Sequence, residues 1–277
     1  MLHLSDVSLV CVDTRDVDLA LKAIGRCMAQ VRFARVMLFT RSALVSRAPE
    51  GIEVIDVDVP SVQAYSEFML RGLAPHVSTS HVLVAQWDGF VRDASRWDPA
   101  FLDHDYIGAP WHDQPPERAV GNGGFSLRSQ RLLQALRDPR LRIEHPEDVA
   151  ICHTNRALLE REHGIRIAPI DVARRFAYER VLPSNPTFGF HGLFNFDREI
   201  PPEDLRRTLS ALSDGVVRGL EVHDLCDTLI AQGRLASASY LLDRRWQMGL
   251  RDRRTLRLAW RMYRARRRGG TRSMEAW

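Results

Sequence analysis

The sequence predicts an α/β protein, a mixed and mostly parallel sheet flanked by helices, with a C-terminal α-helical appendage. Over the first 90 residues, short apolar runs alternate with segments of helical spacing, which is typical of a parallel sheet covered on both faces. Beyond Pro201-Pro202 the pattern is wholly helical. The net charge changes at nearly the same point, from −5 over residues 1–204 to +9 over residues 205–277.

The elements of the first part follow from hydrophobic period and turn residues. The predicted strands are Val7–Val12, Ala34–Phe39, Ile52–Val57, His81–Gln86 and a short Ile165–Ala168. The predicted helices are Asp16–Val31, Ser61–Leu73, Gln130–Arg137 and Pro146–His163, the last ended by Gly164. Residues 91–125 and 176–196 are rich in turn formers and aromatic residues, so we expect loops there.

The second part is predicted to be helical throughout. Its expected helices are Glu203–Leu212, Leu220–Ala231, Leu235–Trp246 and Asp252–Arg266, separated by Gly215, Gly233 and Gly249. The middle pair resembles one tetratricopeptide-like hairpin, but no 34-residue unit repeats, which favours an appendage over a repeat array. We therefore expect a body of residues 1–200 and a basic helical region of residues 201–277.

Composition excludes several classes of protein. The four cysteines have no CxxC pairing, which argues against a zinc knuckle or a disulfide scaffold and favours a reducing cytoplasm. No apolar run reaches the roughly 18 residues of a membrane-spanning helix, so we expect a soluble protein or one peripheral to the inner face of a membrane. Neither an HExxH spacing nor a Gly-x-Ser-x-Gly elbow is present, which removes support for a zinc hydrolase or a nucleophilic triad.

Candidate functional residues follow the predicted strands. Ligands of parallel sheets bind beyond the carboxyl ends of the strands, where Asp13, Thr14 and Arg15 follow the first strand and Asp88 follows the fourth. A carboxylate beside a glycine suits a divalent ion or a diphosphate. A turn aspartate that caps the next segment is the structural alternative.

Three later blocks also carry candidates, each with a structural alternative. Gly121-Asn122-Gly123-Gly124, expected to lead through Leu127-Arg128 into a helix, lets a ligand approach the backbone or is only a tight turn. Glu147-Asp148 offers a general base, or ordinary acids of a first helical turn. His191, in an aromatic loop, is a candidate ligand for Mn²⁺ or phosphate, or a hydrogen-bonded loop residue.

Taken together, these blocks resemble a known family. Val82–Phe90, Asp105–Trp111, Val120–Arg128 and Glu147-Asp148 resemble an uncharacterised glycosyltransferase-like domain family, and their order is similar to the GT-A superfamily of nucleotide-sugar glycosyltransferases. The resemblance covers about residues 5–196. It implies a GT-A-like (Rossmann-like) sheet and transfer of a sugar from a nucleotide-sugar, with UDP the commonest donor nucleotide, to a hydroxyl of a glycan, glycolipid or lipid-linked acceptor. It also implies assistance by Mn²⁺ or Mg²⁺.

The resemblance assigns roles to single residues. Asp88 matches the last aspartate of the Asp-x-Asp motif, which meets the metal, and His191 resembles the late histidine that reaches the metal or diphosphate. Glu147 and Asp148 resemble the acidic pair that supplies the base. The implied donor site is Asp13, Thr14, Arg15, Gln86 and Asp88, and the implied sugar and acceptor pocket is Tyr106, Trp111, Asn122, Gly123 and Gly124. Gln86 stands where the first aspartate is expected, which weakens strict metal dependence and keeps open a catalytically inactive scaffold that acts through the basic tail.

The arginine-rich end leaves three hypotheses open. Arg251–Arg272 holds ten arginines and one aspartate, with Trp260 and Tyr263 interleaved. Packing of this helix on the acidic body ranks first. Contact with an anionic membrane surface ranks second, as a cationic amphipathic helix with Leu256, Trp260 and Tyr263 facing inward. Nucleic-acid binding is a distant third.

Overall fold

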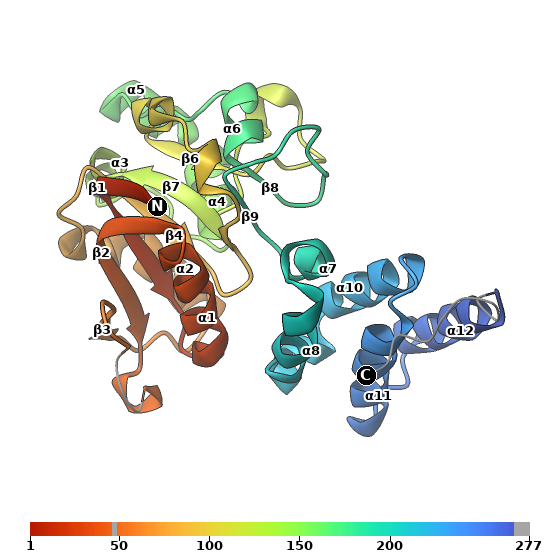
Figure 1. Ribbon diagram of the computed structural model, residues 1–277. Coiled ribbons are helices and arrows are strands. Elements are labelled where there is room, and N and C mark those ends of the chain that lie inside the picture. Colours follow the sequence, from red (N-terminus) through yellow and green to blue (C-terminus); the bar gives the residue numbers. More distant parts are fainter. Residues whose placement is uncertain (46–48, 269–277) are drawn as a thin grey trace. The chain divides into compact units, whose positions relative to one another are not determined.

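The structure is a computed structural model that describes residues 1–45 and 49–268 (Figure 1). The chain forms two compact units, Met1–His191 and Gly192–Trp277, and each is described by itself. The functional division expected at residue 200 stays a prediction.

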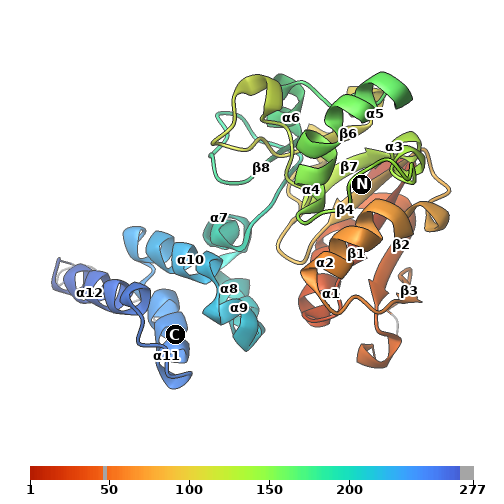
Figure 2. The ribbon, with the colours of Figure 1, turned by 180° about the vertical axis from the view of Figure 1, so that it is seen from behind.

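The first unit is built around a six-stranded, mostly parallel sheet, which Figures 1 and 2 show from opposite sides. Its strand order is β3-β2-β1-β4-β7-β6. The first four of these pair in parallel, whereas β7 runs antiparallel to both β4 and β6. The strands are β1 (Leu2–Val12), β2 (Val31–Thr40), β3 (Glu53–Asp56), β4 (His81–Ala85), β6 (Tyr106–Gly108) and β7 (Phe125–Ser129). The predicted α/β class with a mostly parallel sheet is confirmed.

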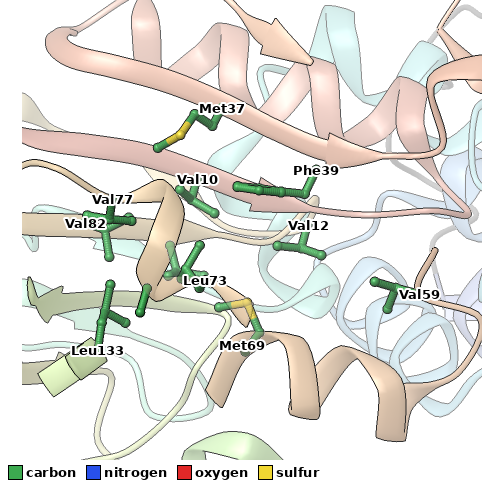
Figure 3. Close-up of a cluster of buried hydrophobic side chains, with 12 residues drawn as sticks. Val10, Val12, Met37, Phe39, Val59, Met69, Leu73, Val77, Val82 and Leu133 are labelled. Atoms are coloured by element: carbon green, nitrogen blue, oxygen red, sulfur yellow. The ribbon is translucent and has the colours of Figure 1, made fainter. Parts of the chain in front are cut away.

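The central strands are apolar because both of their faces are covered. All five residues of β4 and the last six of β1 are buried, as expected for parallel strands inside an α/β sheet. Figure 3 shows one side of this core, where side chains of β1, β2 and β4 meet Met69 and Leu73 of the segment that follows β3. β1 and β4 pair in parallel, so their carboxyl ends lie next to each other. Burial of this apolar cluster stabilises that arrangement.

Two predictions for the middle of the chain are wrong. The glycine block leads into a helix at Gln130 as predicted, but the connecting residues Phe125–Ser129 form strand β7, and Tyr106–Gly108 lies in the sheet as β6 instead of in a loop. β7 escapes the strand pattern because it buries polar side chains on an apolar sheet, above all Arg128. The predicted strand Ile165–Ala168 is reduced to a single bridge between Ile167 and Tyr106.

A second, three-stranded sheet lies in the region predicted as loop. Its strands are β5 (Phe90–Val91), β8 (Ala177–Tyr178) and β9 (Gly189–Phe190). β9 pairs with both neighbours, antiparallel to β5 and parallel to β8. In this small sheet Phe90, just beyond Asp88, pairs with Phe190, just before His191. The pairing brings the segments that contain Asp88 and His191 together.

All but the last of the α-helices of the first unit lie within the predicted helical segments and are shorter than predicted, whereas the last was not predicted. They are α1 (Val17–Met28), α2 (Val62–Glu67), α3 (Gln130–Ala135), α4 (Glu147–Val149), α5 (Arg156–His163) and α6 (Ile170–Phe176). Two predicted long helices are interrupted by one π-helical turn each, at Phe68–Gly72 and Ala150–Thr154. Gly164 ends α5 with φ +64°, as predicted.

The second unit is helical, as predicted. Its helices are α7 (Phe196–Glu199), α8 (Pro202–Ser210), α9 (Asp214–Arg218), α10 (Leu220–Ala231), α11 (Leu235–Gln247) and α12 (Arg253–Arg268). Gly233 and Gly249 take φ values of +76° and +75° in the turns between helices. Gly215 was expected to separate helices, but it lies inside α9. Within residues 1–45 and 49–268, no helix is long and apolar enough to cross a membrane.

Candidate functional site

Three distant chain segments meet at the carboxyl ends of β1 and β4. The backbone N–H of Gln86 donates to the carbonyl oxygen of Gly124 (2.7 Å). A methyl group added at Gly124 would lie 2.0 Å from Nε2 of His191, and one at Gly123 would lie 2.4 Å from Oε1 of Glu147. The glycine block therefore brings residues 86–88, residue 191 and the start of α4 together, because no larger residue would fit between them.

His191 is the centre of this arrangement. Its Nε2 lies 3.2 Å from Oδ1 of Asp88 and 3.2 Å from Oε1 of Gln86. On the other side of the ring, Nδ1 lies 3.5 Å from Oε1 of Glu179 and 3.2 Å from Nδ2 of Asn122. His191 is 9% exposed and Asp88 is 4% exposed, so these charges interact away from bulk water.

The charges around His191 favour a cation at this position. Burial alone would lower the pKa of the His191 imidazole, but the charge of Asp88 and hydrogen bonds to Asp88 and Glu179 outweigh it and raise the pKa well above its usual range. Glu179 follows β8 and was not predicted as a site residue.

The donor atoms around Nε2 also fit a hard divalent ion. One carboxylate oxygen and one amide oxygen lie 3.2 Å from this nitrogen. That spacing is close to the roughly 3 Å between adjacent ligands of an octahedral ion with bonds of about 2.0–2.1 Å. Within the described part of the chain, no three His, Cys, Asp or Glu side chains are grouped to hold a metal ion, so a site here needs the Gln86 amide. Glu179 would then orient the ring through Nδ1.

The two acids of the pair Glu147-Asp148 have different surroundings. Glu147 is 4% exposed, and its Oε1 accepts from Nη2 of the fully buried Arg128 (2.9 Å). Asp148 is partly exposed, and its Oδ2 accepts from the backbone N–H of Gly123 (2.8 Å). The carboxylate of Glu147 is thus neutralised inside the protein, whereas that of Asp148 borders the glycine block and keeps lone pairs for a ligand.

The segment after β1 lies at the same edge of the sheet. Burial raises the pKa of the Asp13 carboxyl, backbone hydrogen bonds from Arg15 and Asp16 lower it, and the charges of Asp16 and Asp88 raise it further, so that the net shift is upward. The influence of Asp88 follows from the pairing of β1 with β4. The Thr14 hydroxyl donates to the Val59 carbonyl (2.8 Å) and ties this segment to the residues after β3.

The two predicted aromatic platforms have different positions. Tyr106 is fully buried on β6, with the Arg128 guanidinium 5.5 Å from its ring centre, so its ring is closed to a sugar. Trp111 is partly exposed, and its indole packs on Gly121, where an added methyl group would lie 2.0 Å away. Its ring stacks edge-on with His153 at 4.9 Å. Only Trp111 of this pair can contact a ligand.

Two polar residues beneath the site, Tyr65 and Arg128, were not predicted as site residues. The Gln86 side-chain amide donates to the Tyr65 hydroxyl (2.9 Å), and burial raises the pKa of Tyr65 well above its usual range. In the part of the chain that the structure describes, two buried atoms beside the glycine block, Oδ1 of Asn122 and Nη1 of Arg128, have no hydrogen-bond partner. Arg128 within an apolar stretch was the one signal available, since a buried charge needs a partner.

Residues 52–191, about half of the 277-residue chain, match a family described as "Protein of unknown function (DUF5672)". The matched span contains Gln86, Asp88, the glycine block and Glu147-Asp148, and it ends at His191. A comparison with curated proteins finds no relative by sequence.

Solved structures show distant similarity. The galactosyltransferase LgtC in complex with donor and acceptor sugar analogues is 13% identical, with 74% of this chain and 94% of LgtC covered and a TM-score of 0.45. An active-site mutant of LgtC has the same identity and coverage and a TM-score of 0.42. The bifunctional IspDF from Campylobacter jejuni is 13% identical over 59% of this chain, with a TM-score of 0.40. The chain spans about half (48%) of the length of IspDF. At this identity and these TM-scores, the similarities carry no argument about function.

Proposed function

Because the chain belongs to the DUF5672 family, whose function is unknown, we propose its function from the site itself. We propose a glycosyltransferase that moves a sugar from a nucleotide-sugar, with UDP-sugars the first choice, to a hydroxyl of a glycan or lipid-linked acceptor. The observation that carries this proposal is the meeting of Asp88 and His191 with a glycine block beside Asp148. This arrangement offers positive charge on one side and a carboxylate base on the other.

The donor side needs positive charge where the diphosphate leaves. A divalent ion held by Gln86, Asp88 and His191 would supply it, by neutralising the charge that develops on the departing oxygen. Glu179 holds the His191 ring from the far side, and Tyr65 holds the Gln86 amide. These contacts fix both side chains before a donor binds, which reduces the reorganisation that the reaction needs.

The acceptor side needs a base. Asp148 is the better candidate of the acidic pair, because Glu147 is committed to Arg128. An acceptor hydroxyl next to the glycine block would give its proton to Asp148 while its oxygen attacks the anomeric carbon. The bond from that carbon to the diphosphate oxygen breaks in the same step. Trp111, which is partly exposed, would pack on the apolar face of the bound sugar.

Asp13 and Arg15 would complete the donor site at the end of β1. Thr14 would have a structural role and would not bind the donor, because its hydroxyl donates to the Val59 carbonyl oxygen. Tyr106 is removed from the proposed pocket by its burial.

A catalytically inactive scaffold is the second candidate. Gln86 in place of an acid favours it, because an amide oxygen holds a divalent ion more weakly than a carboxylate does. A scaffold of this kind would bind a nucleotide-sugar without breaking it, so turnover separates the two candidates.

Binding of the donor can be tested by thermal unfolding with a panel of nucleotide-sugars, with and without Mn²⁺. A ligand at about 100 times its Kd stabilises the native state by about 2.7 kcal/mol. We expect one donor to raise the Tm, more so with Mn²⁺, and Asp88→Asn to abolish the rise. Asp171→Asn is the matched control, since that carboxylate is 84% exposed on α6. An equal rise in Asp88→Asn and the wild type would contradict the proposed site.

A further inference from the structure

Helix α12 presents three large apolar side chains to solvent. Leu256, Trp260 and Tyr263 are 51%, 57% and 54% exposed. Their i, i+4, i+7 spacing puts them on one side of the helix. The opposite side, with Thr255, Leu258 and Met262, is buried, and α12 packs on α10 and α11. The three exposed residues, which we call the α12 stripe, are therefore not the face by which the helix is held in its own unit.

Arginines border the α12 stripe. Arg253, Arg257, Arg264 and Arg267 are exposed, and from residue 253 to residue 268 the helix contains no acidic residue. The Arg264 guanidinium lies 4.6 Å from the ring centre of Trp260, and that of Arg267 lies 5.2 Å from the ring centre of Tyr263. Charge and apolar surface therefore occupy the same side of the helix.

Two other arginines of α12 have partners within the unit. Arg261 pairs with Asp227 of α10 (2.7 Å), and Arg266 donates to Ser239 of α11 (3.0 Å). These two charges are therefore satisfied by α10 and α11. Arg264 and Arg267 instead lie over exposed aromatic rings beside the α12 stripe, where an external surface of negative charge could bind them.

We propose that the α12 stripe and its bordering arginines dock on an anionic lipid bilayer. A helix with this pattern lies in the plane of the interface, with its apolar side chains at the boundary between headgroups and acyl chains. Tryptophan and tyrosine favour that depth, and arginines attract the phosphates of anionic lipids. The proposal rests on the second unit alone and does not depend on the proposed transferase activity.

The apolar part of the surface favours a bilayer over a nucleic acid. Arginines would bind phosphates of either partner, and the two aromatic rings would stack on unpaired bases. Leu256 has no such use, yet it is exposed in line with both rings. Transfer of a continuous apolar stripe out of water is favourable. A bilayer interface offers an apolar environment for it, whereas a phosphate backbone does not.

The test is co-sedimentation of the full chain with vesicles of phosphatidylcholine alone or mixed with phosphatidylglycerol. We expect binding to the mixed vesicles only. Trp260→Ser/Tyr263→Ser should weaken it about tenfold or more, because two apolar side chains no longer leave water. Arg257→Glu/Arg264→Glu should abolish it. Leu220→Ser and Arg218→Glu are the matched controls, since both residues are exposed in the same unit, on α10 and α9.

Unchanged far-UV circular dichroism and Tm would show that the variants are folded, as expected for exposed positions. A blue shift of tryptophan emission on binding, absent in Trp260→Phe, would place that ring in the interface. Equal sedimentation of Trp260→Ser/Tyr263→Ser and the wild type would overturn the proposal. So would displacement from vesicles by a single-stranded oligonucleotide whose own binding is lost in both double variants, because the surface would then belong to a nucleic acid.

Discussion

At the scale of single residues, adjacent positions of one sequence pattern have different environments. Glu147 and Asp148 are equivalent in sequence, as two acids in a first helical turn. In the structure, Glu147 is buried against Arg128, whereas Asp148 accepts a hydrogen bond from the edge of the glycine block. The sequence could predict the pair but not its division, because the partner that neutralises Glu147 lies on a strand that the pattern did not reveal.

This difference predicts that two similar substitutions lower the stability by different amounts. Glu147→Gln leaves the buried Arg128 without a counter-charge and should lower the free energy of unfolding by about 3–5 kcal/mol. Asp148→Asn keeps only one of the two oxygens that accept from the Gly123 and Val149 N–H groups, and should lower it by about 0.5–1.5 kcal/mol. Urea denaturation measures both. Equal destabilisation by the two variants would show that the division is wrong.

The burial of Asp88 also decides how that residue should be tested. The sequence predicts that Asp88→Ala abolishes transfer without unfolding the protein. In the structure, Asp88 is 4% exposed beside His191, so truncation to alanine removes a hydrogen-bonding partner of the buried His191 ring. Asp88→Asn removes the charge and retains an acceptor oxygen, and is therefore the variant that reports on the site.

Asp105 lies outside the candidate site and makes the stability of the protein depend on pH in the acidic range. Burial alone would raise the pKa of its carboxyl, but hydrogen bonds from Arg131, Ser129 and the Arg166 backbone outweigh it and lower the pKa. A lowered folded-state pKa contributes stability above the unfolded-state pKa of about 3.9, and that stability is lost as the pH falls through the folded-state value.

Asp105→Asn should therefore flatten the fall of stability below about pH 4 while also lowering stability at pH 7. Unfolding by urea over a pH series measures this. If the free energy of unfolding falls as steeply at acidic pH in Asp105→Asn as in the wild type, other carboxyl groups cause that fall.

At the scale of elements, the glycine block works by close approach more than by unusual backbone angles. Of residues 121–124, only Asn122 has a positive φ (+50°). The glycines are needed because the indole of Trp111 lies against Gly121, the imidazole of His191 against Gly124 and the carboxylate of Glu147 against Gly123. The block therefore builds the site by letting other parts of the chain approach β7, a role that its sequence does not separate from ligand binding.

Gly124→Ala should consequently destabilise the protein by about 1–3 kcal/mol or more and displace the His191 ring. The control is Gly25→Ala in α1, where no atom lies within 4 Å of the added carbon. That exposed helical position should gain about 0.5–1 kcal/mol. Thermal unfolding of both variants provides the comparison, and a neutral Gly124→Ala would refute the packing around His191.

The elements that could be predicted are those with an apolar period. β1, β2, β3 and β4 and the long helices follow from runs that a core must bury. β7 did not, because its five buried residues, FSLRS, include two serines and an arginine. Distant partners support two of these side chains, Glu147 for Arg128 and Asp105 for Ser129. The short strands β5, β8 and β9 have two residues each, too few for a period to be recognised.

At the scale of the whole molecule, the change of net charge along the sequence corresponds to a change of architecture. The acidic part contains the α/β unit with the candidate site, and the basic part is helical. The charge of the second unit is concentrated on α12, where part of it faces α10 and α11 and part borders the exposed stripe. Sequence periodicity predicted the helix, but only the packing of Leu258 and Met262 decides which of its sides is free.

The central claim is that the site at Asp88, His191 and Asp148 transfers a sugar from a nucleotide-sugar. The most direct measurement is release of nucleoside diphosphate from a panel of nucleotide-sugars with Mn²⁺, for the wild type, Asp88→Asn and Asp148→Asn. We predict release from at least one donor by the wild type, loss of release in Asp88→Asn, and a decrease of about 10²–10⁴-fold in Asp148→Asn with donor binding retained. Release at the wild-type rate by folded Asp148→Asn, or no release by the wild type from any donor that it binds, would contradict the claim.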